Sequence, residues 1–392
     1  MFPSTMQTAE RKERWSVGGA GAAPRASQAK GLAKSAGGAE GRSGATPRSR
    51  PSQAKGLAKS AGGAEGRSGA TPRSRPSQAK GLAKNEALEL LSVEGDELEQ
   101  LIRRAGRVRE QVFGDEVRLC AISNARSGAC PERCDFCAQS AHFRGTGAPT
   151  FPTKSGREIA DEARRAEAAG AREFSIVTSG RSLTRERDVS RVEQALRLIG
   201  EETRLERCAS LGELPDEVLS RLAEAGMLRY HHNVETAPSF HPQIVHTHGY
   251  DDEVRVIERA RAAGLLTCCG GILGMGERPE QRVDLAFALR EIDPDCVPLN
   301  FLDPRPGTPL HGIENDLSPE GCLRIISIFR LVMPDKPIFV CGGREANLGP
   351  LQRRMFEAGA SGTMVGDYLT TSGQAAEADL RMIREAGLFV ER

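Results

Sequence analysis

Three cysteines stand close together in the sequence, at Cys130, Cys134 and Cys137. The segment reads CPERCDFC, which gives the spacing C-x3-C-x2-C. Structural zinc sites usually close a tetrahedron from paired ligands, whereas three thiolates in one short loop leave a fourth coordination position open. Iron–sulfur clusters take cysteine thiolates in such compact runs. The spacing therefore favours a [4Fe–4S] cluster with one iron free for a further ligand, and it disfavours structural zinc.

Strand and helix patterns alternate from about residue 115 onward. The short runs typical of strands are Val117–Ser123, Glu173–Ser179, Arg204–Leu211, Leu228–Glu235, Leu265–Leu273, Cys296–Leu302, Pro337–Cys341 and Gly362–Val365. The helical patterns are Arg157–Ala169, Arg187–Ile199, Asp216–Ala225, Asp252–Ala263, Glu280–Glu291, Pro319–Leu331, Leu351–Ala358 and Ala375–Ala386. Several of these helices end at Ala-Gly, a common helix stop. A further segment, Glu86–Gly114, predicts one or two helices before the first strand.

Eight strands that alternate with eight helices predict a parallel sheet. At this length, eight such units favour a (β/α)8 barrel of the TIM type over a doubly wound sheet. In such a barrel the chemistry belongs to the carboxyl ends of the strands and to the loops after them. The three-cysteine loop follows the first predicted strand, so it lies where this fold places an active site.

The first 84 residues differ from the rest of the chain. They hold 16 of the 54 Lys and Arg residues but only four of the 53 Asp and Glu residues, so this part is basic and the remaining 308 residues are acidic. Ser27–Pro51 recurs without change as Ser52–Pro76, and an eight-residue third copy follows at Ser77–Lys84. Each 25-residue unit offers one Leu and no aromatic residue, too little apolar surface to offset the entropy of ordering. We predict a disordered tail over residues 1–84 and a catalytic body over residues 85–392.

Composition also limits the class of protein. No window approaches the roughly 18 consecutive apolar residues of a membrane-spanning helix, and the N-terminus has no apolar secretory core. Ten cysteines without an export signal indicate metal or redox chemistry in a reducing compartment, so we expect a cytoplasmic enzyme. The acidic body argues against nucleic-acid binding. For the tail, a basic contact segment and an organelle transit peptide are alternatives to the favoured interpretation, a tandem duplication or an upstream start.

Six segments resemble, in order, the motifs of the biotin synthase family of radical S-adenosylmethionine enzymes: SGACPERCDFCAQS, LERCASLG, YHHNVET, CCGGILGMGE, VPLNFLDPRPGTPL and CGGREANL. The resemblance covers the body, including its C-terminal region associated with biotin and thiamin synthesis, and none of the tail. It implies sulfur insertion that converts dethiobiotin to biotin, with one 5′-deoxyadenosyl radical used for each C–H bond broken. It also implies an auxiliary iron–sulfur cluster as sulfur source, an electron donor such as flavodoxin or ferredoxin, and a homodimer.

The resemblance assigns roles to individual residues. Cys130, Cys134 and Cys137 match the ligands of the [4Fe–4S] cluster to which S-adenosylmethionine binds. The cofactor-binding residues that it implies are Phe136, His231, Glu235, His248, Gly270 and Gly271. Asn233 and Asn300 match the residues that bind dethiobiotin.

Some of these assignments are open to other interpretations. His231, Asn233 and Glu235 alternate along the fourth predicted strand and therefore share one face. A hydrogen-bonded polar core is the alternative for these three residues, and the family more often has Asn at the position of His231. A simple strand exit is the alternative for the two glycines.

The chain departs from the family at the auxiliary cluster. Common members hold a [2Fe–2S] cluster with three cysteines and an arginine, of which Cys208 and Cys268 match two cysteines. Ser175 stands in place of the third cysteine, and Phe339 stands in place of the arginine. Cys341 lies two residues beyond Phe339, on the same face of its strand.

We hypothesise that Cys208, Cys268 and Cys341, with Cys269 as a further candidate, bind a remodelled auxiliary cluster. This cluster would be [2Fe–2S] or a larger, sulfide-rich one, as in a variant branch of the family. The alternative is that these thiols are small buried apolar groups. We favour that interpretation for Cys120, Cys296 and Cys322.

Two other functions stay open at this point. Another barrel enzyme of the same superfamily, such as a hydrogenase-cofactor maturase or an amino-acid mutase, shares the scaffold and parts of the motifs. A non-catalytic zinc or iron–sulfur scaffold that recruits a partner through the basic tail is the more remote alternative.

Overall fold

The computed structural model describes residues 81–314 and 316–391, so nearly all of the predicted tail lies outside the described residues. The strands are β1 (Glu116–Arg126), β2 (Glu173–Thr178), β3 (Glu206–Ser210), β4 (Arg229–His231), β5 (Leu266–Cys268), β6 (Gly271–Leu273), β7 (Val297–Phe301), β8 (Ile338–Val340), β9 (Gly362–Met364) and β10 (Phe389–Val390). The long helices are α2 (Gly95–Phe113), α3 (Gly156–Ala168), α4 (Glu186–Glu202), α5 (Asp216–Glu224), α7 (Tyr250–Ala262), α8 (Pro279–Ile292), α9 (Pro319–Val332) and α12 (Ala376–Glu385). The short ones are α1 (Lys84–Glu89), α6 (His241–Ile244), α10 (Arg344–Leu348) and α11 (Arg354–Glu357).

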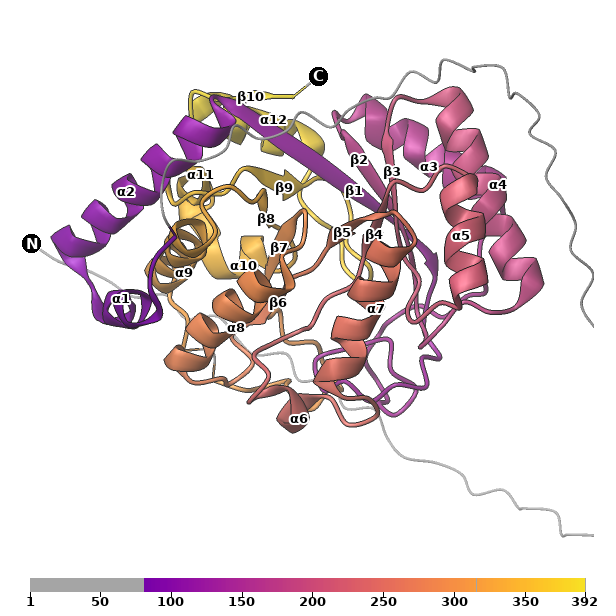
Figure 1. Ribbon diagram of the computed structural model, residues 1–392, viewed down its shortest axis with the longest axis horizontal. Coiled ribbons are helices and arrows are strands. Elements are labelled where there is room, and N and C mark those ends of the chain that lie inside the picture. The colour runs from indigo at the N-terminus through magenta and orange to yellow at the C-terminus, as the bar shows by residue number, and fades with distance from the viewer. Residues whose placement is uncertain (1–80, 315, 392) are drawn as a thin grey trace, which may run out of the picture. The chain divides into compact units, whose positions relative to one another are not determined.

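The strands form one curled parallel sheet with the helices around it (Figure 1). They pair in the order β5-β4-β3-β2-β1-β9-β8-β7-β6, and β10 pairs with β1. The two ends of this order, β5 and β6, are consecutive in the chain, and single bridges link Glu235 to Gly271 and Cys268 to Cys296 across the ends. The predicted TIM-type (β/α)8 barrel is confirmed. The sequence did not predict α6, α10 or β10.

The fifth predicted strand is divided into β5 and β6 because of two glycines. A Cβ on Gly270 would lie 1.8 Å from the carbonyl oxygen of Pro298, and a Cβ on Gly271 would lie 2.5 Å from that of Glu235. No side chain fits at either position, since the backbones of the neighbouring strands occupy that space. The kink at this point allows β5 to pair with β4 while β6 pairs with β7.

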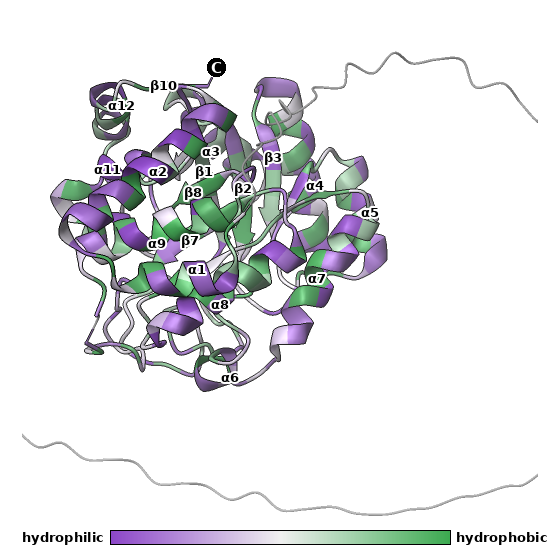
Figure 2. Ribbon diagram, turned by 60° about the vertical axis from the view of Figure 1, so that its left-hand side comes forward, coloured by the Kyte–Doolittle hydropathy of each residue, from purple (hydrophilic) through white to green (hydrophobic). Residues whose placement is uncertain are grey.

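The helices turn apolar faces toward the sheet (Figure 2). The start of α3 is fixed by a capping box, in which the Ser155 side chain accepts from the N–H of Glu158 and the Glu158 side chain accepts from the N–H of Ser155. Gly170 and Gly226, which follow α3 and α5, have φ values of 96° and 98°. They supply the left-handed caps that the Ala-Gly pattern predicts. Among the described residues, no helix is both long enough and apolar enough to span a membrane.

The described chain begins with four residues that belong to the repeats in sequence but to the body in structure. The backbone N–H of Leu82 donates to the carbonyl oxygen of Leu331 at 2.9 Å, and the carbonyl oxygen of Leu82 accepts from Arg290 Nη1 at 2.9 Å. The Leu82 side chain is only 3% exposed. The ordered body therefore includes the end of the third repeat copy.

We expect the substitution Leu82→Ala to lower the free energy of unfolding by about 2–4 kcal/mol, because it removes a buried side chain from a closed apolar site. Denaturant unfolding of the full chain measures this loss. Leu57→Ala is the matched control, since Leu57 occupies the same place in an identical octapeptide outside the described residues. Equal losses in the two variants would contradict the assignment of Leu82 to the body.

Candidate active site

A cavity of about 490 Å³ lies inside the barrel and reaches the loops after the strands. Its lining includes most of the residues that the sequence predicted for the site, namely Cys130, Cys134, Phe136, Cys137, Cys208, His231, Asn233, Glu235, His248, Cys268, Asn300 and Cys341. Cys269, Gly270 and Gly271 are not among the lining residues. One cavity thus holds the three-cysteine loop, a set of polar strand ends and a second group of cysteines.

The three-cysteine loop is shaped by its own backbone. The N–H of Cys130 donates to the carbonyl oxygen of Gln139 at 3.1 Å, and the N–H of Ala141 donates back to Cys130 at 2.8 Å. The N–H of Cys137 donates to the carbonyl oxygen of Cys134 at 2.9 Å, which closes a tight turn between the last two cysteines. These bonds turn all three thiols toward the same cavity.

The chemistry of this donor set fits an iron–sulfur cluster. Burial raises the pKa of all three thiols, to about 11 for Cys137. The proximity of the other cysteines adds to the rise for Cys134 and Cys137. Backbone N–H groups of Gln139 and Ser140 oppose it by donating to Cys137. Three thiols that resist ionisation alone are deprotonated when they bind metal, and N–H bonds to the sulfurs stabilise a bound cluster.

His248 lies between two carboxylates at one side of the cavity. Its Nδ1 is 2.7 Å from Glu132 Oε2, and its Nε2 is 2.7 Å from Glu253 Oε1. Burial disfavours the histidine cation, but Glu253 and Glu132 outweigh burial and raise the pKa of His248 to about 9. Burial likewise opposes the charge on Glu253, but hydrogen bonds from His232 and His248 lower the pKa of Glu253 to about 2. Both ring nitrogens of His248 are therefore engaged, and its predicted contact with a cofactor carboxylate remains a prediction.

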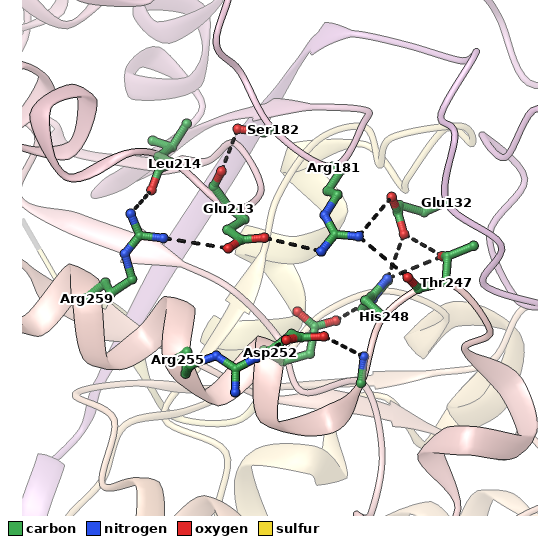
Figure 3. Close-up of polar contacts among 12 residues, drawn as sticks. Glu132, Arg181, Ser182, Glu213, Leu214, Thr247, His248, Asp252, Arg255 and Arg259 are labelled. Atoms are coloured by element: carbon green, nitrogen blue, oxygen red, sulfur yellow. Dashed lines mark hydrogen bonds and ion pairs between the residues drawn. The ribbon is translucent and has the colours of Figure 1, made fainter.

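The sequence analysis missed a second cation at this side of the cavity, Arg181. Figure 3 shows Arg181 between Glu132 and Glu213, and its guanidinium nitrogens lie 3.9 Å and 3.5 Å from the two carboxylates. Its side chain is 48% exposed, so it stands where the cavity meets solvent. Arg181 follows β2 directly, and its position at a strand end is the signal that could have found it.

The raised pKa of His248 predicts a pH dependence of stability. The ordinary pKa is 6.5 and the folded value is about 9, so the ion pairs contribute fully below pH 6.5 and are lost as pH rises through 9. We expect the free energy of unfolding to fall by about 2 kcal/mol more between pH 6.5 and pH 10 in the wild type than in His248→Gln. Denaturant titrations at the two pH values measure the difference, and parallel declines would contradict this role of His248.

Glu235 is buried, strained and only partly paired. Its φ of 63° lies in the left-handed region that non-glycine residues rarely adopt, and β4 ends at His231, before the predicted end at Glu235. Burial first, and the charge of Glu253 second, raise the pKa of Glu235 to about 7. Its Oε2 has no hydrogen-bond partner among the described residues. An unused buried acceptor on the cavity wall fits a ligand hydroxyl.

The predicted substrate residues already hold the barrel together. Asn233 Oδ1 accepts from the N–H of Gly270 at 3.1 Å and lies 3.0 Å from His231 Nε2. Asn300 Nδ2 donates to the carbonyl oxygen of Gly271 at 3.2 Å, and Asn300 Oδ1 accepts from the N–H of Gly342 at 2.9 Å. The Asn300 amide keeps one N–H and one lone pair for a ligand, since an amide has two of each.

Five cysteines, which we call the interior cysteines, line the part of the cavity inside the sheet: Cys120, Cys208, Cys268, Cys296 and Cys341. They come from five different strands or strand ends. The thiol of Cys341 raises the pKa of Cys120, and the thiol of Cys296 raises the pKa of Cys268, with burial adding to both rises. All ten cysteines of the chain are free thiols. A dense group of sulfur donors is the ligand type that iron–sulfur clusters select, so these residues fit a second cluster.

The structure distinguishes three other cysteines. Cys269 is fully buried and is not among the residues that line the cavity, so its place as an auxiliary ligand remains a prediction. Cys120 and Cys296, for which we favoured core packing, do pack with buried apolar groups, and they also line the cavity among the interior cysteines. The prediction for Cys322 is confirmed, since it is fully buried in the core on α9.

Three further predictions can be placed in the structure. Gly270 and Gly271 allow the backbones of neighbouring strands to approach closely. This packing accounts for glycine at both positions, and their contact with a cofactor remains a prediction. Ser175 lines the cavity, and its Oγ is buried with no hydrogen-bond partner among the described residues. Phe339 packs with Cys268, Cys296 and Cys341, so the position of the family's arginine is apolar here.

Two family models and several curated relatives match this chain. The radical SAM superfamily model matches residues 125–289, and that of the Biotin and Thiamin Synthesis associated domain matches residues 298–389. The biotin synthase of Anaeromyxobacter sp. (strain Fw109-5) is 52% identical over 294 residues, which are 75% of this chain and 80% of that one. The biotin synthase of Geobacter sulfurreducens is 50% identical over 308 residues, 79% of this chain and 93% of the relative.

Solved structures share the fold at low identity. Methylornithine synthase matches with a TM-score of 0.70 at 22% identity, over 80% of this chain and 95% of that one. The FeFe-hydrogenase maturase from Carboxydothermus hydrogenoformans matches with a TM-score of 0.68 at 17% identity, over 80% of this chain and 76% of that one. At such identities the likeness shows the barrel alone, so it gives the maturase alternative no support beyond the scaffold.

Proposed function

The chain belongs to the biotin synthase family of the radical S-adenosylmethionine superfamily, and we propose that dethiobiotin binds in its cavity between two metal centres and receives sulfur there. Cys130, Cys134 and Cys137 hold the first centre, a [4Fe–4S] cluster. The interior cysteines hold the second. When bound, the first centre and S-adenosylmethionine supply a carbon radical that takes hydrogen from a C–H bond, and the second centre supplies sulfur.

The residues near the three-cysteine loop bind and orient the cofactor. Phe136 lies between two of the cluster ligands on the cavity wall and offers an aromatic face to the adenine. The unpaired oxygen of Glu235 accepts from the ribose hydroxyls. Glu132, Glu235 and Glu253 make this wall acidic, which favours the positive charges of the sulfonium and the amino group. His248 and Arg181 provide the cations nearest to the cofactor carboxylate.

Dethiobiotin binds between the two centres. Asn300 and Asn233 offer their remaining amide groups to the ureido ring, whose two N–H groups need acceptors and whose carbonyl oxygen needs a donor. The barrel wall keeps water away, since Cys208 and Cys341 beyond the substrate are only 4% and 7% exposed. Fixing the substrate carbons between the two centres is the main contribution of the protein, because proximity decides which bond the radical attacks.

The observation that carries this proposal is that one cavity is lined by both the three-cysteine loop and the interior cysteines. The test is anaerobic turnover of the reconstituted full chain with dethiobiotin, S-adenosylmethionine and a reductant. Mass spectrometry then measures biotin and 5′-deoxyadenosine. We expect both products, and iron and sulfide contents above those of one four-iron cluster per chain.

Other outcomes point elsewhere. Deoxyadenosine without biotin, from protein loaded with both clusters, would indicate a different substrate and would support another radical enzyme of this barrel. Iron no higher than one four-iron cluster per chain would contradict the second centre. Absence of deoxyadenosine from cluster-loaded protein would support the non-catalytic scaffold.

The electron donor, the oligomeric state and the compartment follow from the same assignment. A low-potential donor such as flavodoxin or ferredoxin reduces the first cluster. The active form is a homodimer, as the family implies. We place the enzyme in the cytoplasm, because ten free thiols and oxygen-sensitive clusters require a reducing compartment.

A further inference from the structure

A buried arginine stands beside the interior cysteines. Arg229 is on β4, opposite Cys208 on β3, and Arg229 is only 3% exposed. Its Nη1 lies 2.7 Å from Glu173 Oε2, and its Nη2 lies 3.5 Å from Glu206 Oε2. Two carboxylates from neighbouring strands thus fix the plane and direction of this guanidinium.

The two carboxylates are themselves fixed by further ion pairs. Arg118 on β1 lies 3.1 Å from Glu173, 3.0 Å from Glu206 and 2.9 Å from Glu391. Arg172 adds longer contacts to Glu206 and Glu391. The network holds three arginines against three carboxylates, so it is balanced in charge. It joins four strands and the end of the chain into one buried layer below the cavity.

The guanidinium also contacts a cysteine sulfur. Arg229 Nη1 donates to Cys208 Sγ at 3.7 Å. Its Nε is buried and has no hydrogen-bond partner among the described residues. Arg229 lines the same cavity as Cys268 and Cys296. An unused, buried N–H beside a group of thiols needs an acceptor, because a buried donor without one is costly.

We propose that Arg229 is a positioning residue for the sulfur-donating cluster. It donates charge-assisted hydrogen bonds to the Cys208 sulfur and, from Nε, to a sulfur of the cluster. Glu173 and Glu206 hold it in place. This inference rests on the second centre proposed above.

The physical reason is the charge of such clusters. Thiolate ligands and sulfides make an iron–sulfur cluster anionic, and hydrogen bonds to its sulfurs and nearby charge set its reduction potential. Arginine suits this task better than lysine, since its planar group has five donors and stays protonated when buried. The position that holds arginine in common members is Phe339 here, so among the described residues the cation nearest to the interior cysteines comes from β4.

The test compares two paired substitutions in the full, cluster-loaded chain. Arg229→Met with Glu173→Gln removes the guanidinium together with one of its carboxylates, so that no buried charge is left unpaired. Arg118→Met with Glu391→Gln is the matched control, since it removes an ion pair of the same network that touches no cysteine. Circular dichroism and thermal unfolding first establish that both variants are folded.

We expect the Arg229 pair to shift the midpoint potential of the auxiliary cluster to more negative values by about 60 mV, a tenfold change for a one-electron couple. A chelator should remove this cluster about tenfold faster, while the signal of the first cluster and deoxyadenosine formation without substrate stay unchanged. Arg229→Lys keeps the charge but loses Nε. Its midpoint potential and its rate of cluster loss should lie between those of the wild type and those of the Arg229 pair. The control pair should change neither quantity more than twofold.

Three results would overturn the proposal. A folded Arg229 pair with an unchanged potential and an unchanged rate of cluster loss would overturn it directly. Equal changes of potential and of cluster loss in the control pair would show that Arg229 acts only as a structural member of the ion network. Wild-type protein with no more than one four-iron cluster per chain would remove the second centre itself, and with it this inference.

Discussion

Replacing Cys134 with serine is expected to reduce deoxyadenosine and biotin formation by about a thousandfold or more, which corresponds to about 4 kcal/mol of activation free energy. Cys134 is the middle cysteine of the loop, is half-buried and lines the cavity, and we propose it as a cluster ligand. A serine hydroxyl ionises far less readily than a thiol and is a poor iron ligand, so two cysteines would be left to hold the cluster. Chromatography of deoxyadenosine, together with iron and sulfide analysis, measures the effect.

The matched control is Cys322→Ser, which makes the same chemical change in a core helix outside the cavity. It should cost stability, since a hydroxyl replaces a buried thiol, but deoxyadenosine formation by the folded protein should stay within about twofold. Deoxyadenosine formation by Cys134→Ser at the wild-type rate would contradict the assignment of the loop as the first metal site.

The fold could be predicted, and the three cysteines of the loop could be singled out, because their signals are local. The spacing of Cys130, Cys134 and Cys137 lies within eight residues, and the alternation of strands and helices is a short-range pattern. Helix stops at Ala-Gly and the capping box at Ser155 also depend only on neighbouring residues. Such features survive in the structure because the tertiary contacts agree with them.

The direction of some interior cysteines can be derived from strand alternation. Asn300 was expected to face inward, and Cys296 lies four residues before it, on the same face of a regular strand. Cys268 was expected to face inward, so its neighbour Cys269 had to face outward. Cys120 had no such reference residue on β1, so its direction could not be predicted from alternation alone.

The buried ion network could not be predicted from sequence. Consecutive members of this network are between 23 and 162 residues apart along the chain: Arg118, Glu173, Glu206, Arg229 and Glu391. Only the register of four parallel strands and the pairing of β10 with β1 bring them together. The left-handed backbone at Glu235 is a similar case, because closure of the barrel at Gly271 imposes it and no local pattern does.

Adjacent cysteines on one strand offer the sharpest test of the second site. Cys268→Ala removes a thiol at the end of β5 that lines the cavity, whereas Cys269→Ala removes the thiol of the next residue, which is fully buried and does not line the cavity. We expect Cys268→Ala to lower biotin formation by about a hundredfold or more, because a lost ligand makes the sulfur-donating cluster incomplete or unstable. Deoxyadenosine formation should continue, since the first cluster and the cofactor residues are untouched.

The two variants differ by one position in sequence and by the face of the strand in structure. Cys269→Ala should keep biotin formation within about twofold and lose at most about 1–2 kcal/mol of stability, as expected for the deletion of one small buried group. Iron and sulfide analysis and a count of biotin per chain distinguish the outcomes, because lost ligation lowers metal content and lost packing does not. Equal losses of iron and of biotin in both variants would show that the direction of the thiol does not matter, and would contradict a sulfur-donating cluster held by the interior cysteines.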